Sequence, residues 1–200
     1  MLSHKKSLDI LKKTNALLEG HFVLSSGLHS SKYIQCAKLL SYPHKADSIC
    51  KSLAKNIKKN FKNFDLILAP AMGGIIIGYE IGKILKKETI FWERVKGNFT
   101  LRRGFNIKKN SKVLIIEDVI TTGKSSMECV KLIKKAKAKL VGFASIIDRS
   151  TKKTLKIKKK IISHLKIDVP TYKANQLPYK LKSIPITIPG SRFIKWNALV

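Results

Sequence analysis

The stretch that decides the fold is Val113-Leu114-Ile115-Ile116-Glu117-Asp118-Val119-Ile120-Thr121-Thr122-Gly123-Lys124-Ser125. Its first four residues are apolar and predict a buried strand, and the carboxylates Glu117 and Asp118 follow at the carboxyl end of that strand, where open α/β sheets bind their ligands. Small polar residues then lead into a predicted helix. Such a loop presents backbone N–H groups and the partial positive charge of the helix to a phosphate. The stretch therefore predicts a sugar-phosphate site, in which the carboxylates accept hydrogen bonds from sugar hydroxyls.

Two other interpretations of this stretch are weaker. Gly123-Lys124-Ser125 looks like the end of a nucleotide-binding P-loop, but that motif needs an earlier glycine where this chain has Asp118. A solvated strand end followed by a helix cap accounts for Asp118 or Thr122 singly. It does not account for a whole run of residues that fits one purpose.

The neighbouring segments repeat a pattern of strand, loop and helix. Apolar runs predict strands at residues 65–69, 89–92, 112–116 and 140–147, and helical spacing predicts helices at about 75–86 and 124–138. Strands that are apolar throughout are typical of a parallel sheet covered on both faces. The sequence thus predicts an α/β fold with a central, mainly parallel sheet flanked by helices.

The segments outside this core are also predicted. We expect an amphipathic helix at residues 3–19, a short hairpin from residues 22–24 and 32–36, and a helix from Pro43 to about Asn60. Residues 151–166 are dense in lysine but alternate with apolar residues, which predicts a surface strand rather than a disordered tail.

Composition excludes several classes of protein. The chain has 200 residues, of which 44% are hydrophobic and 26% charged, a mixture typical of one soluble globular domain. Its longest apolar stretch, residues 66–79, is interrupted by Pro70 and by glycines, so we expect no membrane association. The polar N-terminus lacks the apolar region of a secretion signal. Cys36, Cys50 and Cys129 lie far apart, which favours free thiols in a reducing cytoplasm.

The net charge of +29 raises the question of a nucleic-acid partner. Only five of the 41 basic residues are arginines, so most of the charge comes from lysines spread along the chain. Proteins that read nucleic acids rely on arginine, whose planar fork binds phosphate and guanine bidentately. We therefore interpret the lysines as a solvated surface and do not expect a nucleic-acid partner. The arginines are more informative, and they are Arg94, Arg102, Arg103, Arg149 and Arg192.

Residues 113–125 resemble the signature with which type I phosphoribosyltransferases bind 5-phosphoribosyl-1-diphosphate (PRPP). Further pieces resemble the short bacterial form of the orotate phosphoribosyltransferase family, in order and over essentially the whole chain: Gly20 to Ser30, Glu93-Arg94, Leu101-Arg102-Arg103-Gly104-Phe105, Asp148-Arg149-Ser150, Asp168 to Tyr172 and Pro189-Gly190-Ser191-Arg192. The resemblance implies a single phosphoribosyltransferase domain of residues 1–200. A small hood would comprise mainly residues 1–40 and the C-terminal segment, and the core about residues 41–170.

The resemblance also implies roles for individual residues. Glu117 and Asp118 would bind the ribose hydroxyls and act in catalysis, and the loop Val119-Ile120-Thr121-Thr122-Gly123-Lys124-Ser125 would hold the 5-phosphate of PRPP. Thr121 and Arg149 match positions that contact orotate, and Tyr33 falls where the hood meets the base. A third set is basic and would act on PRPP and its diphosphate: Arg94 in binding PRPP, and Lys96, Arg102 and Arg103 in catalysis.

Apart from the resemblance, the position of Arg149 allows two interpretations. A guanidinium at a strand end is a bidentate partner for a carboxylate substrate. An ion pair with Asp148 explains the same residue equally well from position alone.

Departures from related sequences bear on the predicted site. Longer family members have lysines at the positions of Ser25 and Gly73, and a mobile loop rich in lysine and histidine that is replaced here. Some short relatives have a cysteine pair where this chain has Leu177-Pro178-Tyr179-Lys180, so we assign no metal ligand to a protein side chain.

The resemblance implies transfer of the phosphoribosyl group from PRPP to orotate in pyrimidine (UMP) biosynthesis, giving orotidine 5′-monophosphate and diphosphate, with Mg²⁺ as cofactor. It also implies a cytoplasmic homodimer whose loop reaches the neighbouring site. One alternative is a purine phosphoribosyltransferase. Another is a nucleic-acid-binding regulator of the same fold, which the net charge favours and the intact acidic pair disfavours.

Overall fold

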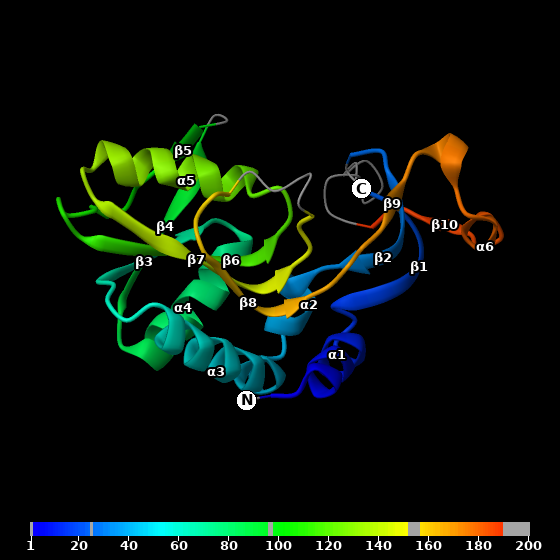
Figure 1. Ribbon diagram of the computed structural model, residues 1–200, viewed down its shortest axis with the longest axis horizontal. Helices are drawn as coiled ribbons and strands as arrows, with labels where there is room; N and C mark the ends of the chain where they lie inside the picture. The colour runs from blue at the N-terminus through cyan, green and yellow to red at the C-terminus, as the bar shows by residue number, and fades with distance from the viewer. Residues whose placement is uncertain (1, 25, 96–97, 152–156, 190–200) are drawn as a thin grey trace, which may run out of the picture.

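The protein is built on two sheets, a large one and a smaller one beside it (Figure 1). The computed structural model describes residues 2–24, 26–95, 98–151 and 157–189. The large sheet has the order β5-β4-β3-β6-β7-β8, with strands β3 (Leu66–Pro70), β4 (Glu88–Val95), β5 (Asn98–Thr100), β6 (Lys112–Ile120), β7 (Lys139–Asp148) and β8 (Ile161–Lys166). All of its strands are parallel except β5, which pairs antiparallel with β4.

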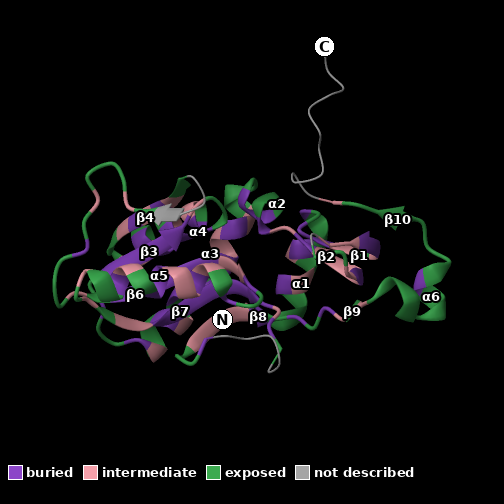
Figure 2. Cartoon of the chain, turned by 90° about the horizontal axis from the view of Figure 1, so that it is seen from above, coloured by how far each residue is buried: buried purple, intermediate pink, exposed green. Residues whose placement is uncertain are grey.

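Helices cover both faces of the large sheet. α3 (Pro43–Asn60) and α4 (Gly73–Leu85) lie on one face, and α5 (Lys124–Lys135) lies on the other (Figure 1). Successive residues of a strand point to opposite faces, so Leu114 and Ile116 pack with α3 and α4, whereas Val113 and Ile115 pack with α5. All four side chains are fully buried, and Figure 2 shows the buried strands between helices with exposed outer faces. Burial on both faces explains the uninterrupted apolar run.

The small sheet joins segments from the two ends of the chain. It has the order β10-β1-β2-β9, with strands β1 (Leu17–Val23), β2 (His29–Ile34), β9 (Thr171–Tyr172) and β10 (Ile186–Thr187). The remaining helices are α1 (His4–Lys13), α2 (Cys36–Leu40), a 3-10 turn (Ala174–Gln176) and α6 (Tyr179–Lys182). The predicted fold class, a mainly parallel α/β core with a small N-terminal hood, is confirmed.

The N-terminal helix is shorter than predicted. It ends at Lys13 rather than at residue 19, because Asn15 adopts a left-handed φ of 54° and the Ala16 N–H closes the helix on the carbonyl of Leu11. Leu17 then begins β1. The hairpin therefore consists of residues 17–23 and 29–34, and the predicted segments 22–24 and 32–36 cover only part of it.

β6 is longer than predicted, which moves the acidic pair into the strand. β7 runs beside it and pairs Val119 with Ile147, so β6 continues through Glu117 and Asp118 to Ile120. Of the lysine-rich stretch, only Ile161–Lys166 is observed as a strand, at the edge of the large sheet, and residues 152–156 lie outside the described residues.

Helix α3 has the bounds that the sequence predicts, Pro43 to Asn60. Proline is favoured at the first helical position because its missing N–H has no partner there in any helix. Among the helices that the structure describes, none combines the length and the apolar character needed to cross a membrane.

Candidate active site

The loop between β6 and α5 forms a hollow of about 80 Å³ lined by Glu117 and residues 119–126. This volume is several times what one water molecule requires. Gly123 turns the chain with a φ of 72°, and a Cβ atom there would lie 2.7 Å from the side chain of Ile157. Both the conformation and the close approach therefore require glycine. The residues of the predicted phosphate loop form one concave surface, and Ser126 also lines it.

Glu117 lines this hollow from the strand. Glu117 is only 8% exposed, and its Oε1 accepts a hydrogen bond of 2.8 Å from the Ser126 hydroxyl. Burial raises the pKa of Glu117 to about 8, and the neighbouring Asp118 adds to the rise while the Ser126 hydroxyl opposes it. The carboxyl group is thus poised to ionise when hydroxyl donors or a cation approach it.

Asp118 leaves the opposite face of β6, towards the start of α4. Its Oδ1 accepts a hydrogen bond of 2.8 Å from the Val119 N–H, and burial raises the pKa of its carboxyl group. A Cβ atom at Gly73 would lie 2.7 Å from Asp118 Oδ2. No side chain fits at Gly73 while Asp118 holds this position, which gives a physical reason for the departure from lysine there. The N-terminal end of α4 favours an anion beside it.

Arg149 and Tyr33 bring the core and the hood together. Arg149 follows β7, and its backbone N–H donates a hydrogen bond of 2.9 Å to the carbonyl of Ile120, the last residue of β6. This bond places Arg149 beside Thr121. Burial lowers the pKa of Arg149, an effect that Tyr33 on β2 partly offsets, and burial raises the pKa of Tyr33. Asp148 accepts a 2.8 Å hydrogen bond from the Ser150 N–H. Within the described part of the chain, Asp148 and Arg149 form no ion pair, and the charge interaction between Arg149 and Tyr33 places the guanidinium near the hood.

Strand β4 carries Arg94 past the end of the neighbouring strand β3. Pro70, the last residue of β3, pairs with Trp92, so residues 93–95 project past β3. Arg94 Nη2 donates to Glu128 on α5 at 2.9 Å, and both side chains are partly exposed. Because α5 begins at the phosphate loop, this ion pair brings Arg94 to the same end of the sheet.

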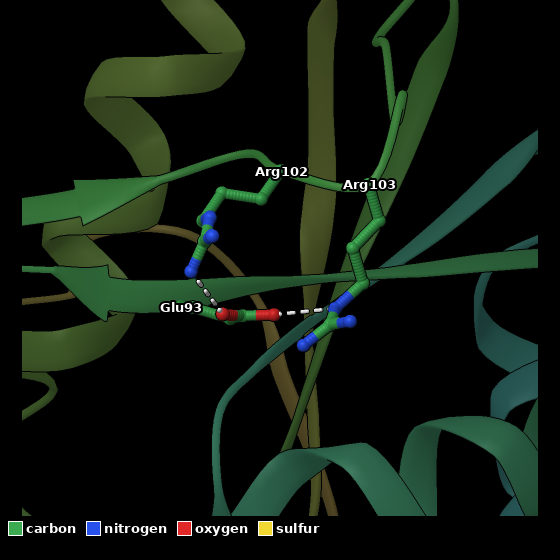
Figure 3. Close-up of polar contacts among 3 residues, drawn as sticks. All are labelled: Glu93, Arg102 and Arg103. Atoms are coloured by element: carbon green, nitrogen blue, oxygen red, sulfur yellow. Dashed lines mark hydrogen bonds and ion pairs between the residues drawn. The ribbon is translucent and has the colours of Figure 1, made fainter.

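Arg102 and Arg103 share one carboxylate, that of Glu93 on β4 (Figure 3). Arg103 Nε donates to Oε1 at 2.6 Å, and Arg102 Nη1 donates to Oε2 at 3.4 Å. Each arginine of the predicted basic set is thus in contact with a carboxylate. Three residues singled out by the sequence lie outside the described residues: Ser25, Lys96 and Arg192.

Sequence reasoning missed the partners that hold the predicted residues. Ser126 was left out of the phosphate loop, although a small residue in the first turn of the helix was a usable signal. Glu93 was singled out only as part of the Glu93-Arg94 piece, and Glu128 was not singled out at all. Their pairing with arginines depends on contacts between separate elements. No cluster of three or more His, Cys, Asp and Glu side chains suited to a metal ion occurs among the described residues.

Comparisons with known proteins agree with this architecture. Residues 42–182 match the family model of the phosphoribosyl transferase domain. The orotate phosphoribosyltransferase of Parvibaculum lavamentivorans is 43% identical over 194 residues, which cover 96% of this chain and 100% of that protein. The chain belongs to the orotate phosphoribosyltransferase family. Enzymes of this family are pentosyltransferases, and hence glycosyltransferases, of pyrimidine biosynthesis.

Solved structures of this family and of a related one share the fold. The orotate phosphoribosyltransferase of Aeropyrum pernix superposes with a TM-score of 0.67 at 22% identity, over 80% of this chain and 92% of that one. An adenine phosphoribosyltransferase from Thermoanaerobacter pseudethanolicus gives a TM-score of 0.59 at 17% identity, over 68% of this chain and 88% of that one. At these identities the structures establish the fold alone, and the family assignment rests on the sequence of the closer relative.

Proposed function

We propose that this protein transfers the 5-phosphoribosyl group of PRPP to orotate, giving orotidine 5′-monophosphate and diphosphate. The observation that carries the proposal is the hollow of about 80 Å³ at residues 119–126, with Glu117 in its wall and Asp118 on the next position of the strand. Family membership supports orotate as the acceptor.

The residues of the site divide into three binding tasks. The N–H groups of residues 119–126 hold the 5-phosphate, and the N-terminus of α5 adds its partial positive charge. Glu117 and Asp118 accept hydrogen bonds from the ribose hydroxyls. Arg149 and Thr121 bind orotate, whose carboxylate suits a half-buried guanidinium. The partly buried ring of Tyr33 covers the base from the hood.

Magnesium fits this set of residues as a substrate-bridged ion. Glu117 and Asp118 are hard oxygen donors, and burial raises the pKa of both carboxyl groups, so a cation beside them would offset the cost of ionising them. Mg²⁺ typically combines one or two carboxylates with substrate phosphates and water. Glu117 and Asp118 would hold the ion together with the bound substrate. When bound, the ion would neutralise negative charge on the diphosphate.

The reaction exchanges one bond at the anomeric carbon for another. A ring nitrogen of orotate forms a bond to this carbon as the bond to the diphosphate oxygen breaks, and diphosphate keeps the electron pair. The ring nitrogen releases its proton to diphosphate or water, and the sugar carries positive charge in the transition state. Arg94 binds PRPP before this step. Lys96 and Arg102 stabilise the departing diphosphate, and Arg103 follows Arg102 in the same basic segment, which runs from β4 to Phe105. Closure of this segment excludes water from the sugar cation.

A homodimer is the second part of the proposal, and a stripe of apolar side chains on α4 supports it. Met72, Ile76 and Tyr79 are 82%, 51% and 63% exposed and share one helix face. Exposed apolar patches of this kind are typical of protein interfaces. Met72 directly precedes Gly73, whose backbone lies against the Asp118 carboxylate, so a second copy seated here would lie close to the acidic side of the site. A Tyr79→Glu variant should sediment as a monomer, and a mixture of Asp118→Asn and Arg102→Ala subunits should regain activity in heterodimers.

A cytoplasmic location is also part of the proposal. Cys36, Cys50 and Cys129 are free and buried, as expected in a reducing compartment. The rival function, a nucleic-acid-binding regulator, predicts steeply salt-dependent binding of duplex DNA that survives at physiological salt. We expect weak binding that is lost there.

Substrate profiling tests the proposed function directly. Purified protein should release diphosphate from PRPP and Mg²⁺ when orotate is added, and should not do so with adenine or xanthine. Turnover with a purine instead of orotate would replace this function with that of a purine phosphoribosyltransferase. Absence of turnover with every acceptor would reject an enzymatic role.

A further inference from the structure

Glu93 contacts two arginines, and the two contacts differ in length. Its side chain is only 20% exposed, whereas those of Arg102 and Arg103 are 57% and 61% exposed. Figure 3 shows each arginine bonded to a different carboxylate oxygen. The Arg103 contact of 2.6 Å is short even for a charge-assisted hydrogen bond. The Arg102 contact of 3.4 Å is longer than the usual range of about 2.7–3.2 Å.

Arg103 has a second partner that Arg102 lacks among the described contacts. Its guanidinium carbon lies 5.7 Å from the centroid of the Phe91 ring, within range of a cation–π interaction. Phe105 packs edge-on against the same ring, with centroids 5.2 Å apart. Phe91 and Glu93 are two residues apart on β4, so they present one face to Arg103. A ring and a carboxylate together fix this guanidinium.

The backbone conformation also differs between the two arginines. The Phe105 N–H donates to the Arg102 carbonyl at 3.0 Å, which closes a turn with Arg103 and Gly104 at its centre. Their φ values of 59° and 73° make it a turn of the mirror-image type that favours Asn-Gly or Gly-Gly. A residue such as arginine is disfavoured at positive φ. The contacts with Glu93 and Phe91 offset that cost, so the turn depends on the Arg103 side chain.

We propose that Glu93 and Phe91 hold Arg103 as the anchor of the basic segment, and that Arg102 is the cation that moves to the diphosphate. The inference rests on the proposed function and assigns separate tasks within it. A diphosphate carries several negative charges and competes readily for a guanidinium held by one long contact. Transfer of Arg103 would break both of its contacts and the turn. Glu93 and Arg103 are therefore positioning residues, and Arg102 is a catalytic residue.

A matched pair of variants, Arg102→Gln and Arg103→Gln, separates the two tasks. The first measurement is the affinity for inorganic diphosphate with Mg²⁺, by titration calorimetry. Arg102→Gln should weaken binding about 10- to 100-fold, the loss of one or two hydrogen bonds to a charged group. Arg103→Gln should weaken it about threefold or less. Equal losses in the two variants, or a larger loss in Arg103→Gln, would overturn the assignment.

The second measurement is amide hydrogen exchange of residues 101–105 in the protein without substrate. Arg103→Gln should speed exchange of the Phe105 N–H about tenfold or more, because its hydrogen bond closes the turn. Glu93→Gln should do the same, and the double variant should add little to either. Arg103→Lys keeps a charge for Glu93 and should restore part of the protection. Arg102→Gln should leave exchange unchanged, and faster exchange in that variant would refute the anchoring role of Arg103.

Kinetics link these readouts to the reaction. Arg103→Gln and Glu93→Gln should lower kcat while leaving the KM for orotate unchanged. Loss of folded protein would also lower the apparent kcat, so each rate is expressed per folded molecule, with the folded fraction measured by circular dichroism. Wild-type protein that turns over orotate and PRPP, with both variants equally active, would refute this inference but not the proposed function. Wild-type protein without turnover would refute the proposed function. If that protein also fails to bind diphosphate, the role of Arg102 falls with it.

Discussion

The phosphate loop at residues 119–126 and the basic segment from β4 to Phe105 are built in opposite ways. The loop is a backbone structure: its shape follows from a strand end, a glycine with φ of 72° and a helix start. The basic segment is organised by side chains, because Glu93 and Glu128 contact three arginines from other parts of the chain. The proposed phosphate site is therefore fixed by local backbone geometry, whereas the cations are held by pairing with carboxylates.

The two regions also differ in the sign of their charge and in how far that charge is buried. Glu117 and Asp118 are acids whose pKa values burial raises, so this part of the site favours an incoming cation or hydroxyl donor. The arginines of the basic segment are partly exposed and already paired. A ligand that carries hydroxyls at one end and diphosphate at the other satisfies both regions at once. Variants in the two regions should therefore fail in different ways.

The largest effect should come from Asp118→Asn. The asparagine side chain keeps the acceptor for the Val119 N–H but loses the charge that strengthens bonds to the ribose hydroxyls. Turnover should fall ~100-fold or more, while the free energy of unfolding stays within about 1 kcal/mol. Steady-state kinetics and urea denaturation measure the two. Asp9→Asn, on an exposed pair with Lys13, is the matched control, and near-normal turnover of Asp118→Asn would remove the ribose assignment.

The pH dependence of stability should be the next largest effect, and it belongs to Glu117. Its pKa in the folded protein, about 8, lies above the ordinary value of 4.5, so the folded state binds the proton more tightly. The stability that Glu117 contributes is fully present below pH 4.5 and is lost as the pH rises through about 8. Relative to Glu117→Gln, wild type should lose up to about 1.4 kcal/mol per pH unit in this window.

Denaturation of both proteins across that range measures the difference, in which other titrating groups cancel. Glu19→Gln, at an exposed carboxylate paired with Lys12, should give a curve parallel to wild type. Parallel curves for wild type and Glu117→Gln would show that Glu117 is ionised throughout, and that the hollow is more polar than its burial indicates.

Two glycines with nearly the same φ, one in each region, differ in how closely their surroundings pack. Gly123→Ala meets both a φ of 72° and the Ile157 side chain at 2.7 Å, so it should lower the free energy of unfolding by about 2–4 kcal/mol. Gly104→Ala has a φ of 73° with nothing within 4 Å and should cost about 1 kcal/mol. Thermal and urea unfolding measure both. Equal losses would mean that Ile157 moves aside and that the loop is less rigid than proposed.

The sequence predicted the shape of the loop after β6 well, because its determinants are local. Hydrophobic runs, glycine and the helix start all lie within residues 113–125, so their spacing defines the site. It predicted the end of β6 less well, because that end depends on where β7 runs beside it. The opposite orientations of Glu117 and Asp118 follow from that extension. The partners Glu93 and Glu128 depend on contacts between elements, which no periodicity in the sequence reveals.

The smallest effect should come from Arg94→Ala, at the junction of the two regions. Its ion pair with Glu128 joins two partly exposed side chains, so its loss should change the free energy of unfolding by about 0.5 kcal/mol or less. Arg94 stands on β4 two residues past Trp92, the last residue that pairs with β3, and its backbone pairs with that of Phe99 on β5. A cation held in place by this pairing binds the ground state and the transition state alike. We therefore expect the KM for PRPP to rise roughly tenfold with kcat nearly unchanged.

Glu128→Gln is the control for this last change, because it removes the partner and leaves the cation. The KM for PRPP should then stay within about twofold of wild type. A rise equal to that of Arg94→Ala would mean that the ion pair acts as a unit and that Arg94 serves α5 rather than PRPP. Arg102→Ala should instead lower kcat, because its contact forms as diphosphate departs. Unchanged kinetics at Arg94, Lys96, Arg102 and Arg103 would leave diphosphate to magnesium and the backbone, and the basic segment would be structural.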